Sequence, residues 1–447
     1  MLNSFKNIEP LVSRIELLAS RPDRYVDSPA SRAAVADALN GQLSKTLRHV
    51  VPISTLQEYG AFFTSDTMSD ELVADLSDEE IASGSVFDPT CGGGNLLLAY
   101  ARRLPIKATL SETLELWGQK IHGFDLHEAF VRSTRARLAL LASYRGTEVY
   151  GSKYCDKPIS SLERAFPNIR SCDAVRTQWP KVQYLLLNPP YNRVASDDNC
   201  EWASGKVSLA AKFIELSLNG AIEGASIRAI LPDVLRAGSN YRSWRELLNK
   251  KSYVEQIKIL GQFDTDTKVD VFLLRLNLVR EVTSSPAPWM PQSLADAGAQ
   301  ENLKVRDFFD VSVGRVVPHR DAEIGELVSY IHAKHLPPWK IIRVGGIERR
   351  FTGVTFRPPF VLVRRTSRSK DANRAVATIV RAAGCIGKKV AVENHLIILQ
   401  PKSKRLRDCK ELMGRLSDSR TNNWLNDRIR CRHLTVSALQ DLPWWSE

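Results

Sequence analysis

The tetrad Asn188-Pro189-Pro190-Tyr191 combines groups that could bind and activate an amino group. It follows the apolar run 184–187, which predicts a buried strand that ends at the two prolines. The Asn188 amide oxygen and the Pro189 carbonyl can accept hydrogen bonds from an amine, and Tyr191 offers a ring face to a planar base. Because proline restricts the backbone, that carbonyl is oriented at little entropic cost. The tetrad predicts a site that makes an exocyclic amine nucleophilic, although a strand followed by a rigid turn would also account for it.

A glycine-rich segment, Asp88-Pro89-Thr90-Cys91-Gly92-Gly93-Gly94, lies upstream between a short apolar run and a helical pattern. Glycine allows a tight turn and a close approach to a ligand, and the start of the following helix presents free N–H groups to an anion. The segment lacks the Gly-x-Gly-x-x-Gly spacing of dinucleotide sites and the Gly-Lys-Ser/Thr of phosphate loops. It therefore indicates a nucleotide-like ligand other than NAD or ATP.

Together, the glycine-rich segment and the tetrad resemble the motifs of the N6-adenine DNA methyltransferases. Their order is that of the gamma group, with the cofactor motif first, the catalytic motif next and a target-recognition domain last. The segment 60–65, Gly-Ala-Phe-Phe-Thr-Ser, resembles the family's upstream cofactor motif, but Ser65 replaces its proline, which would make the turn looser and puts cofactor binding there in doubt. The resemblance covers about residues 56–280 well and the C-terminal third loosely.

The resemblance implies methyl transfer from S-adenosylmethionine to the N6 amine of an adenine that is flipped out of duplex DNA. It implies that the catalytic residues are Asn188, Pro189, Pro190 and Tyr191. It assigns the cofactor to Phe63, Thr64, Asp88, Cys91, Gly92, Gly94, Asp125 and Asp173. In the family's pattern Asp88 would hold the methionine ammonium, Asp125 the ribose hydroxyls and Asp173 the adenine amine, while Thr64 would close the methionine side.

The alternation of apolar runs and helical patterns predicts an α/β fold, a doubly wound and mostly parallel methyltransferase sheet with a C-terminal basic target-recognition domain. We expect a helical N-terminal extension (1–55), a catalytic domain (56–282), a linker rich in serine and proline (283–300) and the recognition domain (301–447). The polar segment 192–206 beside the tetrad could be a lid over the flipped base or an ordinary surface loop.

The basic charge is concentrated at the C-terminal end of the chain. Residues 341–447 contain 22 Lys and Arg against 9 Asp and Glu, whereas the rest of the chain is close to neutral. Such asymmetry is typical of a domain that binds a polyanion, and double-stranded DNA is the expected partner. The strand-like run 360–363 leads into a basic, hydroxyl-rich loop that suits phosphate contacts. The DNA-binding residues predicted there are Arg364, Arg365, Arg368 and Lys370.

Composition excludes several other classes of protein. No apolar stretch has transmembrane length and the N-terminus lacks a signal-peptide pattern, so we expect a cytoplasmic protein with no membrane partner. Seven cysteines without a Cys-x-x-Cys pair argue against a disulfide framework or a zinc site, and we expect no metal. No nuclease motif is evident, so a separate restriction endonuclease or defence-system partner is possible. A methyltransferase of RNA or of protein glutamine, and a DNA-binding module without catalysis, stay open as alternatives.

Overall fold

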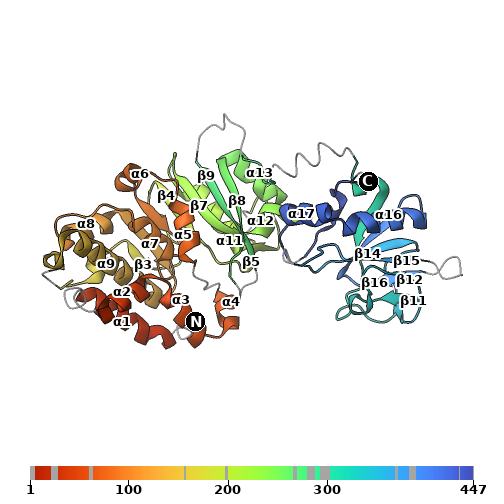
Figure 1. Ribbon diagram of the computed structural model, residues 1–447, viewed down its shortest axis with the longest axis horizontal. Helices are drawn as coiled ribbons and strands as arrows, with labels where there is room; N and C mark the ends of the chain where they lie inside the picture. Colours follow the sequence, from red (N-terminus) through yellow and green to blue (C-terminus); the bar gives the residue numbers. More distant parts are fainter. Residues whose placement is uncertain are drawn as a thin grey trace. The chain divides into compact units, whose positions relative to one another are not determined.

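A computed structural model places the chain in two compact units. The residues it describes are 6–21, 29–59, 64–155, 158–196, 200–264, 269–278, 287–291, 303–367, 371–381, 389–431 and 433–445. Unit 1 comprises Met1–Leu235 and Arg242–Ala287, and unit 2 comprises Arg236–Tyr241 and Pro288–Glu447. Figure 1 shows the helices and strands of both, coloured along the sequence.

A seven-stranded sheet in the order β3-β2-β1-β4-β7-β9-β8 forms the centre of unit 1. The strands are β1 (Val86–Asp88), β2 (Ile121–Asp125), β3 (Ile169–Ser171), β4 (Tyr184–Leu187), β7 (Ser226–Pro232), β8 (Tyr253–Gln262) and β9 (Asp270–Asn277). The strands from β3 to β7 are parallel, whereas β9 is antiparallel to both of its neighbours. All of β7 and most of β4 are buried, as expected for a sheet that is covered on both faces. The predicted mixed α/β sheet is confirmed.

Helices alternate with these strands along the chain, and several of them pack on the sheet. They are α5 (Asp66–Val73), α6 (Asp78–Ser83), α7 (Asn95–Ala101), α8 (Leu110–Lys120), α9 (Glu128–Tyr150), η3 (Ser152–Cys155), α10 (Leu162–Ala165), α11 (Leu209–Gly220), α12 (Asp233–Ala237) and α13 (Arg242–Lys251). Polar segments beside the sheet form a small antiparallel pair, β5 (Arg193–Ala195) and β6 (Lys206–Ser208). The two ends of the segment 192–206, which was expected to be a lid or a surface loop, therefore lie in paired strands.

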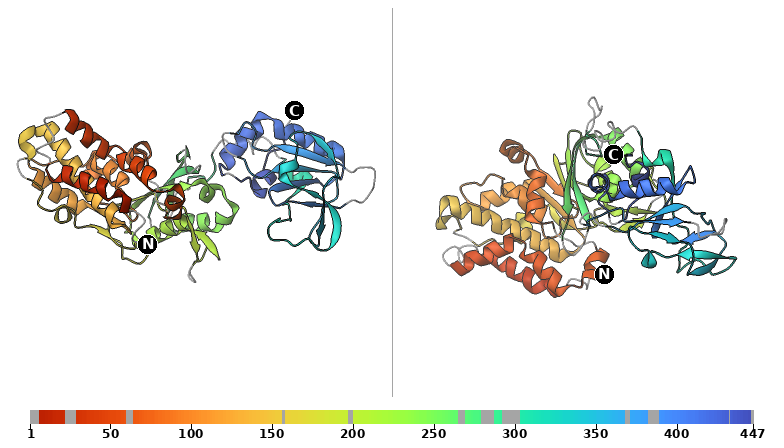
Figure 2. Two further views of the ribbon diagram at one scale, coloured as in Figure 1. Left: turned by 90° about the horizontal axis from the view of Figure 1, so that it is seen from below. Right: turned by 45° about the vertical axis from the view of Figure 1, so that its right-hand side comes forward.

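The N-terminal segment forms helices that belong to unit 1. They are η1 (Lys6–Ile8), α1 (Glu9–Ser20), α2 (Pro29–Leu39), α3 (Gln42–Val50) and α4 (Ile53–Tyr59). Figures 1 and 2 show α1 and α2 lying along α9. Arg132 of α9 donates hydrogen bonds to Glu9 and Glu16 of α1. Because α9 packs on β2 and β3 as well as on these helices, it is buried on more than one side.

Unit 2 combines a five-stranded sheet in the order β10-β17-β14-β15-β12 with a three-stranded sheet in the order β13-β11-β16. Its strands are β10 (Phe309–Val313), β11 (Glu326–Ile331), β12 (Ile341–Arg343), β13 (Glu348–Phe351), β14 (Phe360–Arg364), β15 (Ala377–Arg381), β16 (Val390–Val392) and β17 (Leu396–Pro401). Its helices are η4 (Ser239–Tyr241), α15 (Val305–Phe308), η5 (Ala333–His335), α16 (Leu406–Ser417), α17 (Ser419–Arg428) and α18 (Val436–Gln440).

The segment 392–399 differs from the continuous strand that its sequence suggests. The run 392–399 reads as one strand but is interrupted by a turn, in which the Leu396 amide donates to the Glu393 carbonyl. The two resulting strands, β16 and β17, belong to different sheets of unit 2.

Within the described ranges, no helix is both long and apolar enough to cross a membrane.

Candidate active site

The sheet brings together four polar residues that follow neighbouring strands. Asp88 ends β1, Asp125 ends β2, Asp173 follows β3 and Asn188 follows β4. These strands are adjacent and parallel, so their carboxyl ends lie at one edge. The chain order reverses between β1 and β4, and open α/β sheets bind their ligands at such a switch point.

The glycine-rich turn lies against the end of β2 and against α9. The Gly92 amide donates to Asp125 Oδ2 over 2.9 Å, and the Thr134 hydroxyl of α9 donates to the Gly92 carbonyl over 2.8 Å. Gly92 and Gly94 have φ values of 51° and 83°, which side chains rarely allow. A Cβ atom at Gly94 would also come within 2.8 Å of Thr134 Cγ2. Both the backbone and the neighbouring helix therefore require glycine at position 94.

The carboxyl groups of Asp88 and Asp125 are buried at this edge, and burial disfavours their ionised forms. Burial, with a smaller contribution from the nearby Asp125 charge, raises the pKa of Asp88 to about 8, against a hydrogen bond from the Thr90 amide. Burial likewise raises the pKa of Asp125 to about 6, although the His127 and Gly92 amides donate to it. A cationic ligand group beside Asp88 would favour its ionised form.

The other two predicted cofactor residues of this edge differ in exposure. Asp173 is half-buried, accepts a hydrogen bond from the Val175 amide and lies 3.5 Å from the Arg176 guanidinium. Cys91 is buried and its amide donates to the Phe124 carbonyl. Burial raises the pKa of the Cys91 thiol well above its usual range, so the thiol stays neutral and fits packing rather than nucleophilic attack.

The Asn188 side chain connects the cofactor motif to the catalytic tetrad. Asn188 Nδ2 donates to Thr64 Oγ1 over 2.8 Å, and the Tyr191 hydroxyl donates to Asn188 Oδ1 over 2.9 Å. The Tyr191 ring meets Phe263 edge-to-face, with 6.0 Å between the ring centroids. Burial raises the pKa of Tyr191, so its hydroxyl keeps its proton and remains a donor. Pro189 is buried and Pro190 half-buried between these two residues.

The sequence motifs did not predict three features of this site. The Thr64 hydroxyl contacts the catalytic amide, whereas the family pattern assigns it to the methionine side. Asn95 Nδ2 donates to the Thr64 carbonyl, and Arg137 donates to Asn95 Oδ1. Available signals were a polar residue at the start of the apolar helix 95–101 and a basic residue within the apolar run around position 137.

The predicted DNA-binding residues fall in unit 2 or outside the described ranges. Arg364 and Arg365, at the end of β14, are half-buried. Arg364 Nη2 donates to the Leu336 carbonyl over 2.6 Å, and the Arg365 amide donates to the His395 carbonyl. The remaining predicted residues outside the described part of the chain are Phe63, Arg368 and Lys370.

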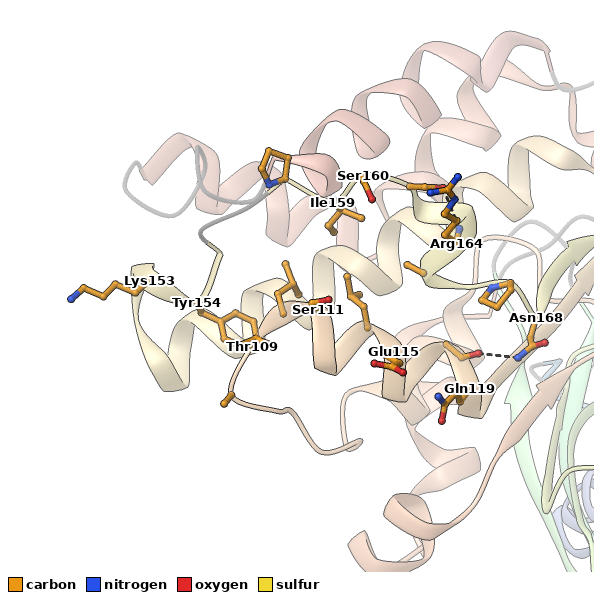
Figure 3. A pocket seen from close by; sticks show the side chains of 18 residues that line it. Thr109, Ser111, Glu115, Gln119, Lys153, Tyr154, Ile159, Ser160, Arg164 and Asn168 are labelled. Carbon is orange, nitrogen blue, oxygen red and sulfur yellow. Dashed lines mark hydrogen bonds between the residues drawn. The ribbon is translucent and has the colours of Figure 1, made fainter.

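A large cavity in unit 1 lies apart from these residues. It measures about 770 Å³ and is lined by α8 and the residues just before it, by η3 and by the segment 158–168, including Thr109, Glu115, Tyr154 and Arg164 (Figure 3). None of the predicted catalytic or cofactor residues that the structure describes lines it. In the part of the chain that the structure describes, no group of three His, Cys, Asp or Glu side chains could hold a metal ion.

Comparison with known proteins points to one kind of enzyme. No protein-family model matches the chain. A segment of 221 residues is 24% identical to the type II methyltransferase M.BsuBI of Bacillus subtilis, and it covers 48% of this chain and 42% of that protein. The chain resembles a restriction–modification methyltransferase. The alignment spans less than half of this curated relative.

A solved structure extends the similarity of fold to almost the whole chain. The type IIL restriction–modification enzyme MmeI, in complex with DNA, superimposes with a TM-score of 0.58 over 97% of this chain and 79% of MmeI, at 12% identity. The predicted resemblance to restriction–modification methyltransferases is confirmed by the curated relative, and the predicted fold, that of S-adenosylmethionine-dependent methyltransferases, by this superposition.

Proposed function

We propose that this protein is a site-specific DNA methyltransferase that transfers a methyl group from S-adenosylmethionine to the N6 amine of adenine. The observation that carries the proposal is the Asn188 amide, held between Thr64 and Tyr191 at the edge of the sheet where the glycine-rich turn also lies. An amide oxygen and a following proline carbonyl suit an amino group as substrate, and they need no metal or covalent intermediate.

The chemistry of the strand-end residues fits the cofactor. S-adenosylmethionine carries a positive sulfur that makes its methyl group electrophilic. Asp88 would bind the ammonium, Asp125 the ribose hydroxyls and Asp173 the adenine amine, with the amides of the glycine-rich turn at the carboxylate. The raised pKa of buried Asp88 supports a cationic partner, because the ammonium would compensate the charge that burial penalises.

The tetrad would bind the target amine and leave its lone pair free. Asn188 Oδ1 and the Pro189 carbonyl would each accept a hydrogen bond from N6–H, which draws the nitrogen towards tetrahedral geometry. An amide oxygen has two lone pairs, so Oδ1 can accept from the amine while it also accepts from the Tyr191 hydroxyl. The Tyr191 ring would stack on the base, a contact worth about 1–3 kcal/mol. Placement in line with the methyl group then supplies much of the rate.

Duplex DNA is the substrate that the second unit favours. An adenine inside the double helix must be flipped out at a cost of a few kcal/mol, which contacts with the DNA backbone would offset. The basic excess of residues 341–447 would supply such contacts through Arg364, Arg365, Arg368 and Lys370. The DNA-bound state of MmeI supports this proposal. We further propose a role in modification, in a restriction–modification or phage-defence system whose endonuclease is a separate protein.

Transfer of labelled methyl groups tests this function. The protein is incubated with labelled S-adenosylmethionine and, in separate samples, unmodified duplex DNA, structured RNA and a protein extract. We expect label on DNA adenine, and we expect Asn188→Ala to lower the rate at least about a hundredfold, as for other groups that stabilise a transition state. Asn40→Ala, at an exposed turn, is the matched control and keeps full activity.

The other samples decide between this proposal and its alternatives. Label on RNA or protein alone would assign the tetrad to one of the other methyltransferase families. Absence of both label and S-adenosylmethionine binding would support a DNA-binding module that lacks catalysis, whereas cofactor binding without label in any sample would point to a missing partner subunit. Modification-sensitive sequencing of the labelled DNA would give the recognition sequence.

A further inference from the structure

Arg137 is a buried cation of α9 that joins three separate parts of unit 1. Its side chain is completely buried. Arg137 Nε donates to the Ala38 carbonyl over 2.8 Å and Nη2 to the Leu39 carbonyl over 3.1 Å, both at the C-terminus of α2. A helix C-terminus carries partial negative charge, which suits a guanidinium. Arg137 Nη1 donates to the Gly93 carbonyl and, over 2.6 Å, to Asn95 Oδ1.

The contact with Arg137 determines which way the Asn95 amide faces. Its oxygen must point to the guanidinium, which has donors only, so its nitrogen points the other way. There Nδ2 donates to the Thr64 carbonyl over 2.5 Å. Asn95 is almost fully buried and begins α7 immediately after Gly94. The glycine-rich turn is thereby tied to the backbone of residue 64.

Thr64 contacts both Asn95, through its carbonyl, and the catalytic Asn188 amide, through its hydroxyl. Its hydroxyl accepts from Asn188 Nδ2, so the Asn188 oxygen faces the Tyr191 hydroxyl and the proposed position of the amine. A reversal of the Asn95 amide would place donors against the Arg137 guanidinium and an acceptor against the Thr64 carbonyl, which leaves buried polar groups unsatisfied. Asn95 thereby fixes the backbone of residue 64, and with it the position of the hydroxyl that contacts Asn188.

We propose that Arg137 and Asn95 are positioning residues that orient the Asn188 amide through Thr64 and so couple the glycine-rich turn and α2 to the catalytic tetrad. Neither residue needs to contact the substrate. The kinetic part of this inference rests on the proposed methyl transfer. The helices that precede the sheet would then contribute to catalysis as well as to stability.

Asn95→Asp is the variant that tests whether this hydrogen-bond series contributes to catalysis as well as to stability. A carboxylate keeps an acceptor for Arg137 but loses the donor to the Thr64 carbonyl. Asn168→Asp is the matched control, because Asn168 Nδ2 also donates to a backbone carbonyl of unit 1, that of Gly118 (Figure 3), outside this network. We expect Asn95→Asp to lower kcat by about 10- to 100-fold, as a misplaced catalytic group does, with little change in KM for DNA. Asn168→Asp should leave kcat within about twofold of wild type.

A spectroscopic measurement tests the coupling without reference to the substrate. Tyr191→3-fluorotyrosine places a single ¹⁹F probe next to the hydroxyl that donates to Asn188. We expect Asn95→Asp and Arg137→Lys to shift the ¹⁹F resonance, because the acceptor of the Tyr191 hydroxyl is displaced, and Asn168→Asp to leave it unchanged. An unshifted resonance in both network variants would overturn the inference, as would wild-type kcat in Asn95→Asp.

The two measurements also distinguish this inference from the proposed function. If the wild-type protein transfers no methyl group to DNA but the resonance shifts, the positioning network stands and the function is wrong. If wild-type protein methylates DNA and Asn188→Ala does not, while Asn95→Asp changes neither kcat nor the resonance, the function stands and the network is wrong.

Discussion

The catalytic edge of unit 1 and the basic loop of unit 2 position their residues in different ways. At the edge, Asp88, Asp125 and Asn188 follow adjacent parallel strands, and backbone amides and neighbouring side chains hold them. In unit 2, Arg364 and Arg365 follow β14 but are half-buried, and the Arg364 guanidinium donates to the Leu336 carbonyl. The ends of adjacent parallel strands therefore place the first set, and hydrogen bonds from other segments orient its side chains, whereas the Arg364 guanidinium is held by a contact inside unit 2.

A substitution in the glycine-rich turn should show the strength of the local constraint, with the largest expected effect. In Gly94→Ala the new Cβ would meet Thr134, and alanine would have to adopt a φ of 83°. The positive φ costs about 1–2 kcal/mol and the added atom a further 1–3 kcal/mol. We expect the free energy of unfolding, measured by urea denaturation, to fall by the sum of both.

Gly224→Ala separates the two contributions to that loss. Gly224 has a φ of 80°, but no atom lies within 4 Å of the place its Cβ would take. This variant should lose only the cost of the backbone conformation. Equal losses in the two variants would show that Thr134 moves aside freely and that the turn is less constrained than the structure indicates.

Substitutions of Tyr191 measure how much of the catalytic edge depends on the ring and how much on the hydroxyl. Tyr191→Ala removes the proposed stacking surface, which is worth about 1–3 kcal/mol of transition-state stabilisation. We therefore expect kcat/KM to fall by about 5- to 150-fold. Tyr191→Phe keeps the ring but removes the donor to Asn188 Oδ1, which we expect to cost about 1 kcal/mol. Steady-state methyl transfer measures both. A larger loss in Tyr191→Phe than in Tyr191→Ala would contradict stacking as the main role of this residue.

The separation along the chain between interacting residues explains what the sequence could predict. The glycine-rich turn and the tetrad were recognisable because each is a short segment whose residue types meet the needs of its own backbone. The sheet was predictable because strands such as β4 and β9 are largely apolar runs. Arg137 was not, since its partners Asn95 and Ala38 lie 42 and 99 positions away. The turn at residues 394–395 was also missed, although the polar residues Glu393, Asn394 and His395 interrupt the apolar run there. The roles of the individual site residues stay predictions.

The pH dependence of stability tests the burial of the two carboxyl groups. The pKa of Asp88 is raised to about 8 in the folded protein from 3.8, so the folded state holds a proton that the unfolded chain has lost. The contribution of Asp88 to stability is therefore full below about pH 4 and declines as the pH rises to about 8, with a slope of at most about 1.4 kcal/mol per pH unit. Asp125, at about 6, acts in the same direction between pH 4 and 6.

Asp88→Asn should remove this decline between pH 6 and 8, whereas Asp125→Asn should flatten only the part below pH 6. Urea denaturation between pH 5 and 8 gives the slopes. Binding of S-adenosylmethionine adds a second readout. The cationic ammonium favours ionised Asp88, so calorimetry below pH 8 in buffers of different ionisation enthalpy should detect proton release, and Asp88→Asn should abolish it. Unchanged proton release in that variant would place the ammonium elsewhere.

The smallest expected effects concern DNA binding by unit 2, and they decide whether the half-buried arginines take part. Each side chain that contacts a phosphate should lower the dependence of log K on log salt by about 0.9 when it is removed. We expect this change for Arg364→Ala and for Arg365→Ala on duplex DNA. Arg405→Ala, at an exposed residue before α16, is the matched control and should leave the slope unchanged. If Arg405→Ala changes the slope and neither loop variant does, the loop at the end of β14 supports the fold of unit 2, and the DNA-binding surface lies on α16 instead.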